Sequence, residues 1–371
     1  MSKEENRKNF SKYVSQNILG MIGFSCYVLA DSYFISIAKG ADGLTALNLV
    51  MPLYSIIFSI GEMIGVGSAI RYAISKIKKD ADADDYFWNA LIWCILSSML
   101  FVFAGIFFSA DIMRVLGADE HIVAVGNNYT KIFMCFAPMF MCNYVTNAFV
   151  RNDGAPGIAM SATLFSSLFN IVFDYILMFP MNLGMEGAAL ATALSPIIGM
   201  GICSIHFFSK KSSVRLVVCK PSVRKLVAGS QLGVSAFVGE MSSAVITLAF
   251  NFVILKLAGN VGVAAYGVVA NIAIVTTAVF NGVAQGSQPL ISSCFGRGDK
   301  DGCTQLKRMG YTTAFVLAAV MYSILFIFAG QFVAVFNSEG SEMLRLYATE
   351  GVKLYFIGIF FAGINIVGGG A

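Results

Sequence analysis

Charged residues are scarce in this chain of 371 residues. Asp, Glu, Lys and Arg make up 12% of it, whereas an average globular protein carries about 25%. So few charges cannot cover the surface of a water-soluble protein of this size, and 57% of the residues are hydrophobic. Because a bilayer-spanning helix needs roughly 20 mostly apolar residues, the long apolar runs predict a polytopic α-helical membrane protein.

Histidine and closely spaced cysteine are also rare. The chain has two histidines, and its eight cysteines are scattered without a C-x-x-C pair. Most of these cysteines lie in apolar runs, where Cys behaves as a small hydrophobe. The sequence therefore argues against a metal site built on His or Cys. It also contains no nucleophile–base set and no P-loop, so we expect no enzyme activity, no catalytic residues and no cofactor.

Ten apolar segments predict membrane-spanning helices. They cover residues 14–38, 46–70, 86–109, 124–150, 157–180, 184–208, 227–257, 262–292, 309–335 and 346–371. Polar or Pro- and Gly-rich breaks separate them at 76–85, 151–156, 180–184 and 210–225. Pro52, Pro138, Pro196 and Pro289 lie within spans, where proline kinks a helix.

Lys and Arg indicate how the chain is oriented, because cytoplasmic loops carry an excess of them. With a cytoplasmic N-terminus, the inner segments hold most of the 25 Lys and Arg residues, with Arg151 in one of these loops. The sequence therefore predicts a multi-pass protein of the cell membrane with its N-terminus in the cytoplasm. The net charge of +4 reflects this topology, so nucleic acid is not an expected partner.

The chain contains an internal repeat. A shift of 219 residues places Gly40 and Gly67 on Gly259 and Gly286, and a shift of 222 places Asn143 on Asn365. An even number of spans separates the copies, so both enter the membrane in the same direction, as in the parallel repeats of some secondary transporters. The repeat predicts an all-α fold of two parallel six-helix bundles, related by a pseudo-twofold axis along the membrane normal.

The repeat also predicts how the chain is divided. Residues 1–209 form an N-terminal lobe, 210–225 a cytoplasmic connector and 226–371 a C-terminal lobe. The second lobe has only four predicted spans, and its last residues, 368–371, correspond to a point inside the fourth span. We therefore expect a truncated chain; the alternative is a natural ten-span protein.

Acidic residues inside the membrane need an explanation, because each costs about 2.5–3.5 kcal/mol on insertion scales. Asp31 and Asp174 each lie about six or seven residues, roughly 10 Å, inside the outer ends of their spans. Asn170 lies one turn from Asp174 on the same helix face. Thr192 reaches a depth of roughly 12 Å in the following span. These four residues from three spans predict a cation- or substrate-binding site in the outer half of the first lobe.

A purely structural role is the alternative interpretation. Asn and Thr often join membrane helices through hydrogen bonds, and Asp31 could face a wet crevice near the surface. Glu62 and Glu240 lie deeper, toward the cytoplasmic half, and are secondary candidates for which a site and local pairing are equally open. No Lys or Arg is predicted near mid-membrane, so the cavity should be acidic or neutral, which favours cationic or amphipathic cargo over anionic cargo.

Several short stretches are similar to one family of transporters. They are Leu29–Ile35, Arg151–Gly154, Asn170–Leu177, Gly184–Thr192, Val263–Gly267 and Gln285–Pro289. Through them the chain resembles, over essentially its whole length, the multidrug and toxic compound extrusion (MATE) family and its DNA-damage-inducible-protein-F-like branch. The N-x-x-x-D motif followed by G-A-A-L-A-T is the most specific part of the resemblance.

The resemblance implies twelve helices in two six-helix lobes that form a V, with cargo exchanged for H⁺ or Na⁺. It also implies that Asp31, Asn170, Asp174 and Thr192 form the cation site of the first lobe, with Na⁺ as the only metal ion expected. The first span lacks the proline at which some relatives bend it, so that bending step is not carried over. Glu240 lies about one turn from an acid of another branch, and that role is not carried over either.

Together these features predict a cation-coupled antiporter that exports cationic or amphipathic small molecules, such as drugs, by alternating access. Two carboxylates close together in a low dielectric resist joint ionisation, so a proton, Na⁺ or a cationic cargo can each occupy the site. A monomer in contact with membrane lipid is expected. A lipid-linked oligosaccharide or polysaccharide flippase of the same superfamily is the alternative, and it would predict basic cavity residues. A channel or sensor would not need a two-lobe repeat.

Overall fold

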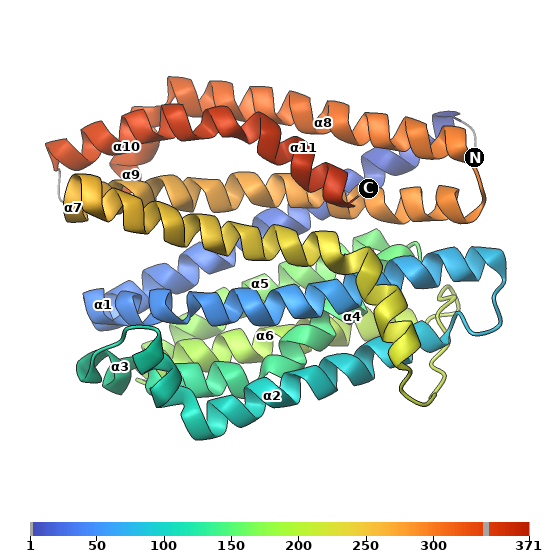
Figure 1. Ribbon diagram of the computed structural model, residues 1–371, viewed down its shortest axis with the longest axis horizontal. Coiled ribbons are helices and arrows are strands. Elements are labelled where there is room, and N and C mark those ends of the chain that lie inside the picture. The colour runs from blue at the N-terminus through green and yellow to red at the C-terminus, as the bar shows by residue number, and fades with distance from the viewer. Residues whose placement is uncertain (1–2, 337–340, 371) are drawn as a thin grey trace.

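The computed structural model describes residues 3–336 and 341–370, and the regular structure of these residues is entirely helical (Figure 1). Side chains at 41, 248, 251, 252, 255, 260, 263, 335 and 336 lie outside this description. The first part of the chain forms α1 (Lys3–Lys78), α2 (Asp85–Val115), α3 (Glu120–Cys135), α4 (Ala137–Asn152), α5 (Pro156–Met178) and α6 (Gly184–Phe207). The second part forms α7 (Val223–Gly296), α8 (Lys300–Ile327), α9 (Ala329–Phe336), α10 (Glu342–Tyr355), a 3₁₀ turn (Phe356–Gly358) and α11 (Ile359–Gly370).

Most of the predicted spans correspond to long apolar helices. Among the described residues, eight helices are long and apolar enough to cross a membrane, and the bent pair α3–α4 would make nine. The predicted span 227–257 is the first half of α7 and includes side chains outside the description. The all-α membrane fold is thus confirmed, while the count of ten spans stays a prediction.

The first and second predicted spans, and the seventh and eighth, are joined by tight turns at a single glycine. α1 is helical from Lys3 onward, and its two halves join at Gly40 (φ 58°, ψ −142°). α7 contains the same turn at Gly259 (φ 62°, ψ −158°). Glycine adopts this backbone conformation without a steric penalty, so one residue replaces a loop. Figure 1 shows the chain reversing after the first half of α1, with the second half running back at an angle to the first.

The fourth span of each copy is broken rather than straight. α3 and α4 meet at Phe136 with a bend of 46°, and Pro138 lies in the first turn of α4. Proline has no N–H to continue the helix and favours a first-turn position. In the second copy the 3₁₀ turn Phe356–Gly358 separates α10 from α11 at the related place. The other three prolines predicted to kink spans lie inside continuous helices.

Pairs of large and small residues support the register of the repeat. Gly61 on α1 lies against Met141 on α4, because a Cβ added to Gly61 would be 3.0 Å from the Cα of Met141. At the related place Phe280 on α7 lies against Gly363 on α11, where an added Cβ would be 2.7 Å from Phe280 Cε1. The two shifts found in the sequence relate Gly61 to Phe280 and Met141 to Gly363.

The two halves of the molecule meet closely at the helix ends predicted to face the cytoplasm. A Cβ on Gly67 of α1 would lie 2.1 Å from the carbonyl oxygen of Gly229 on α7. A Cβ on Gly233 would lie 2.0 Å from a carbonyl oxygen of α1. The second half of α7 crosses the first half of α1 in the same manner, with Gly286 against Val14. The repeat relates these two crossings to each other.

A buried polar network holds the predicted connector, residues 210–225, against the N-terminal helices. The carboxylate of Asp153 accepts hydrogen bonds from His206 Nε2 (2.8 Å), the Ser213 N–H (2.9 Å) and Ser212 Oγ (3.2 Å). The side chains of Asp153 and His206 are only 2% and 4% exposed. One carboxylate therefore joins the ends of α4 and α6 to the connector.

We expect Asp153→Ala to lower the free energy of unfolding by about 3 kcal/mol, because removing one member of a buried polar pair leaves the others uncompensated. Thermal unfolding of the protein in detergent would measure the change. Asp80→Ala, at an exposed acid of the α1–α2 loop, is the control and should unfold like the wild type. An unchanged midpoint for Asp153→Ala would contradict the proposed importance of this network.

The far end of the connector is held at the surface. Lys225 pairs with Asp82 (3.0 Å) and Asp85 (2.5 Å) at the start of α2. The hydrogen bond from Lys225 lowers the pKa of Asp82. A lowered pKa means that this pair stabilises the fold above the ordinary pKa of Asp and loses that contribution as pH falls through the shifted value. Because Asp82 is 62% exposed, the contribution is small.

Candidate functional site

The four residues of the predicted site are buried between three helices. Asp31 on α1 is 7% exposed, Asn170 and Asp174 on α5 are 0% exposed, and Thr192 on α6 is 2% exposed. The small residues Gly187, Ala188 and Ala189 begin the buried face of α6, and α6 approaches α5 closely, since a Cβ on Gly187 would lie 2.8 Å from the α5 backbone. The three helices thus enclose polar groups that lie on different segments of the chain.

Asn170 connects the acid of α5 to α6. In the amide orientation that satisfies both ends, Asn170 Nδ2 donates to Asp174 Oδ2 (3.1 Å) and Oδ1 accepts from Thr192 Oγ1 (3.1 Å). The reverse orientation would set the amide oxygen against the carboxylate oxygen, which is repulsive. Asn170 and Thr192 therefore fix the position of the Asp174 carboxylate.

Each of the two acids has an oxygen without a donor. Oδ1 of Asp31 and Oδ1 of Asp174 are buried and find no hydrogen-bond partner in the part of the chain that the structure describes. The two carboxylates are close enough to interact electrostatically. An unsatisfied buried oxygen is costly, and an unpaired buried charge more so. A proton or a small cation at this place would remove that cost.

Neutral oxygens would have to complete any metal coordination here. Over residues 3–336 and 341–370, no group of three or more His, Cys, Asp or Glu side chains is placed to hold a metal ion. Na⁺ accepts carbonyl, hydroxyl and carboxylate oxygens, so Asp31 and Asp174 with Asn170 and Thr192 form a suitable donor set. The involvement of these four residues in cation binding stays a prediction.

Three tyrosines that the sequence analysis did not select lie near the two acids. Both Asp31 and Asp174 act electrostatically on the hydroxyls of Tyr27, Tyr54 and Tyr129. Tyr27 lies one helical turn before Asp31 on the same face, a signal that helix periodicity offered. Tyr54 and Tyr129 reach the site from the second half of α1 and from α3, and only tertiary packing brings them there.

The secondary candidates form a separate cluster. Glu62 on α1 and Glu240 on α7 are half-buried and interact electrostatically with each other, and Glu62 also interacts with Arg151. Arg151 was predicted to lie in a cytoplasmic loop, but it belongs to the last turn of α4 and is 6% exposed. Its Nη2 donates to Asn147 Oδ1 (2.9 Å). The acid on α1 compensates the buried cation, which supports the pairing interpretation of Glu62.

A family model named MatE matches residues 17–176 and 236–371 of this chain. The chain belongs to the MATE family. Two relatives named multidrug export protein MepA are similar to this MATE protein. The one from Staphylococcus saprophyticus is 25% identical over 360 residues, which is 94% of this chain and 78% of the relative. The one from Staphylococcus aureus is 27% identical over 336 residues, which is 90% of this chain and 72% of the relative.

Solved structures share the fold of this MATE protein. An outward-facing multidrug resistance MATE family transporter of the MOP superfamily has a TM-score of 0.87 at 21% identity, over 98% of this chain and 84% of that chain. A MOP superfamily transporter from Pyrococcus furiosus, described by the reverse polarity of its binding pocket, has the same values. These likenesses concern the fold alone. They confirm the predicted two-bundle architecture, and the narrower branch assignment stays a prediction.

Family membership identifies the chain as a multi-pass transporter of a cell membrane. The names of the relatives given above refer to multidrug export and do not favour the flippase alternative.

Proposed function

We propose that this MATE protein is a cation-coupled antiporter that exports cationic or amphipathic small molecules by alternating access. The observation that carries the proposal is the pair of buried carboxylates, Asp31 and Asp174, each with an oxygen for which the described residues supply no donor. The multidrug export named for both relatives supports a drug-like cargo. The protein acts as a monomer with its N-terminus in the cytoplasm.

Exchange follows from competition for one negative charge. H⁺, Na⁺ or a cationic cargo can each neutralise the acid pair, so binding of one displaces another. Transport also requires the occupants to favour different arrangements of the lobes, since a ligand with equal affinity for both arrangements shifts nothing. Asp31 lies on the first half of α1, and the same half crosses α7 where Gly286 meets Val14. A change at the acids can therefore act on this lobe contact through one helix.

Efflux of ethidium from vesicles containing the protein tests this function, with the H⁺ and Na⁺ gradients imposed separately. We expect efflux to require at least one gradient and to stop when that gradient is collapsed. Ethidium movement at an unchanged rate with neither gradient present would contradict antiport and favour a passive pathway.

A further inference from the structure

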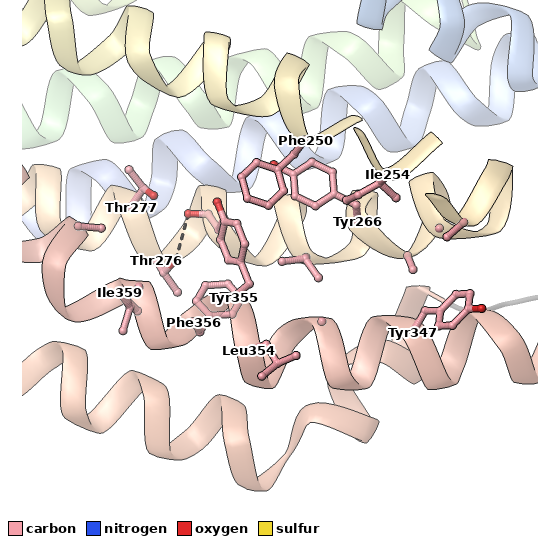
Figure 2. A pocket seen from close by; sticks show the side chains of 18 of the residues that line it. Phe250, Ile254, Tyr266, Thr276, Thr277, Tyr347, Leu354, Tyr355, Phe356 and Ile359 are labelled. Atoms are coloured by element: carbon pink, nitrogen blue, oxygen red, sulfur yellow. Dashed lines mark hydrogen bonds between the residues drawn. The ribbon is translucent and has the colours of Figure 1, made fainter. Parts of the chain in front are cut away.

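A cavity of about 640 Å³ lies inside the C-terminal helices (Figure 2). It is lined by the two halves of α7, by α10, by the 3₁₀ turn and by the start of α11. Its described lining is aromatic and aliphatic, and within that described part the polar side-chain groups are Thr and Tyr hydroxyls. Small-molecule sites typically have this size and a mainly apolar lining with few polar groups.

Three aromatic rings form one wall of the cavity. Phe250 and Tyr266 of α7 stack with ring centroids 5.4 Å apart and an interplanar angle of 11°. Tyr355 of α10 meets both edge-on, at centroid distances of 6.0 and 6.2 Å. Figure 2 shows the three rings gathered together, with Thr276 beside them. The Thr276 hydroxyl donates to the carbonyl oxygen of Ala273 (3.0 Å), so this donor is used within its own helix.

The related region of the N-terminal lobe is filled by aromatic side chains. Tyr54 stacks on Phe133 with centroids 3.6 Å apart and an angle of 16°, and its hydroxyl hydrogen-bonds to Tyr129 (2.5 Å). Phe58 packs against Phe133 and Phe140 at centroid distances of 6.2 and 5.5 Å. These five rings form one continuous cluster of packed aromatic side chains.

Smaller residues open the same region in the C-terminal lobe. The repeat replaces Phe133 by another ring, Tyr355, but it replaces the four surrounding rings, in the order Tyr54, Tyr129, Phe58 and Phe140, by Ala273, Gly351, Thr277 and Ala362. All five replacements line the cavity. Tyr355 occupies the position related to Phe133. The residue related to Tyr54, which stacks on Phe133 in the first lobe, is Ala273, so no ring covers Tyr355 from that position.

The cavity is also neutral where the first lobe is acidic. The repeat relates Asp31 to Phe250, and among the residues that the structure describes, the lining contains no Asp, Glu, Lys, Arg or His. A ligand that enters this cavity is recognised by its shape and its rings rather than by its charge.

We propose that this cavity binds a flat aromatic ring of the exported molecule, which stacks on Tyr355 as Tyr54 stacks on Phe133. The inference rests on the proposed export function and narrows its cargo to molecules that combine a positive charge with planar rings. The acid pair of the first lobe neutralises the charge, and the cavity of the second lobe selects the ring.

Restoring the missing side chains tests the proposal. Ala273→Tyr and Thr277→Phe each fill the cavity with the ring type found at the related position, and Val316→Phe adds a ring on the exposed face of α8, where residue 316 is 52% exposed. Ethidium binding to the purified protein is measured by fluorescence. We expect both filling variants to weaken it about tenfold or more, the loss of one stacking contact, and Val316→Phe to bind like the wild type. Unchanged affinity in both filling variants would overturn the proposal.

Further measurements separate this inference from the proposed function and from misfolding. Gradient-driven efflux of tetrabutylammonium, a cation without rings, should be the same in the filling variants and the wild type; if the wild type moves neither cation, the export function itself fails. Tyr355→Leu removes the stacking ring without filling the cavity and should also weaken ethidium binding. A phospholipid that co-purifies with the wild type and is lost from Ala273→Tyr, with ethidium affinity unchanged, would make the cavity a lipid site and overturn the proposal.

Discussion

Ion-driven efflux is expected to fall to the level of protein-free vesicles in an Asp174→Asn variant. The substitution keeps an oxygen that can accept the hydrogen bond from Asn170 Nδ2, so the packing of α5 is preserved. It removes the negative charge for which H⁺, Na⁺ and cargo compete. Without this competition, neither ion gradient can be coupled to movement of the cargo. The measurement is ethidium efflux under imposed gradients, compared with the wild type at equal protein density.

Asp111→Asn is the matched control. Asp111 lies near the end of α2, is 63% exposed and pairs with Arg114, so the same chemical change occurs far from the acid pair. Its efflux should equal that of the wild type. If Asp174→Asn exported ethidium at the wild-type rate under an ion gradient, the acid pair could not be the coupling site.

Gly233→Ala is expected to abolish export by preventing the lobes from meeting at their cytoplasmic ends. The added methyl group would lie 2.0 Å from the carbonyl oxygen of Met63, far inside van der Waals contact and against backbone rather than a flexible side chain. The crossing of α1 and α7 must therefore separate. Efflux should fall to background, and amide hydrogen exchange should rise in residues 60–70 and 226–236, where the two helices protect each other.

Gly239→Ala, on the same helix, controls for the loss of a glycine. No atom of the described residues lies within 4 Å of a Cβ added there, and alanine favours the helix more than glycine does. Its transport and its hydrogen exchange should match those of the wild type. Wild-type efflux in Gly233→Ala would show that this crossing is not needed for transport.

Much of the fold was predictable because membrane helices have a strong local signal. Apolar length and the distribution of Lys and Arg depend on single segments, and the repeat is visible as matching residues. The turns at Gly40 and Gly259 were missed because a helix reversal at one glycine carries no polar loop. The early start of α1 at Lys3 was missed because a polar helix outside the membrane has no apolar run.

The candidate site was predictable for a similar reason. Depth along a span and spacing of four residues placed Asp31, Asn170, Asp174 and Thr192 at one level, and the structure encloses them between three helices. Tyr54 and Tyr129 could not be selected, because their approach depends on how the helices cross. The burial of Arg151 was hidden as well, since a basic residue beside a turn normally indicates a solvated end.

The cavity in the C-terminal lobe lay beyond sequence reasoning. Ala273, Gly351, Thr277 and Ala362 are ordinary residues for packed membrane helices, and nothing local distinguishes a residue that fills space from one that leaves it open. The missing ring opposite Tyr355 is seen only when the aromatic cluster of the first lobe is compared, residue by related residue, with the cavity lining of the second.

In the pair Gly61–Met141 the large side chain lies on α4, whereas in the related pair Phe280–Gly363 it lies on α7. This difference limits which substitutions the two halves can accept. Each pair joins one large side chain to one glycine but places the large residue on opposite partners, so the two halves are not interchangeable at these positions. A hybrid that joined one helix from each half would bring two large side chains, or two glycines, face to face. Drift here must proceed by paired substitutions, and a chimaera built by swapping whole helices between the lobes should fail at these points first.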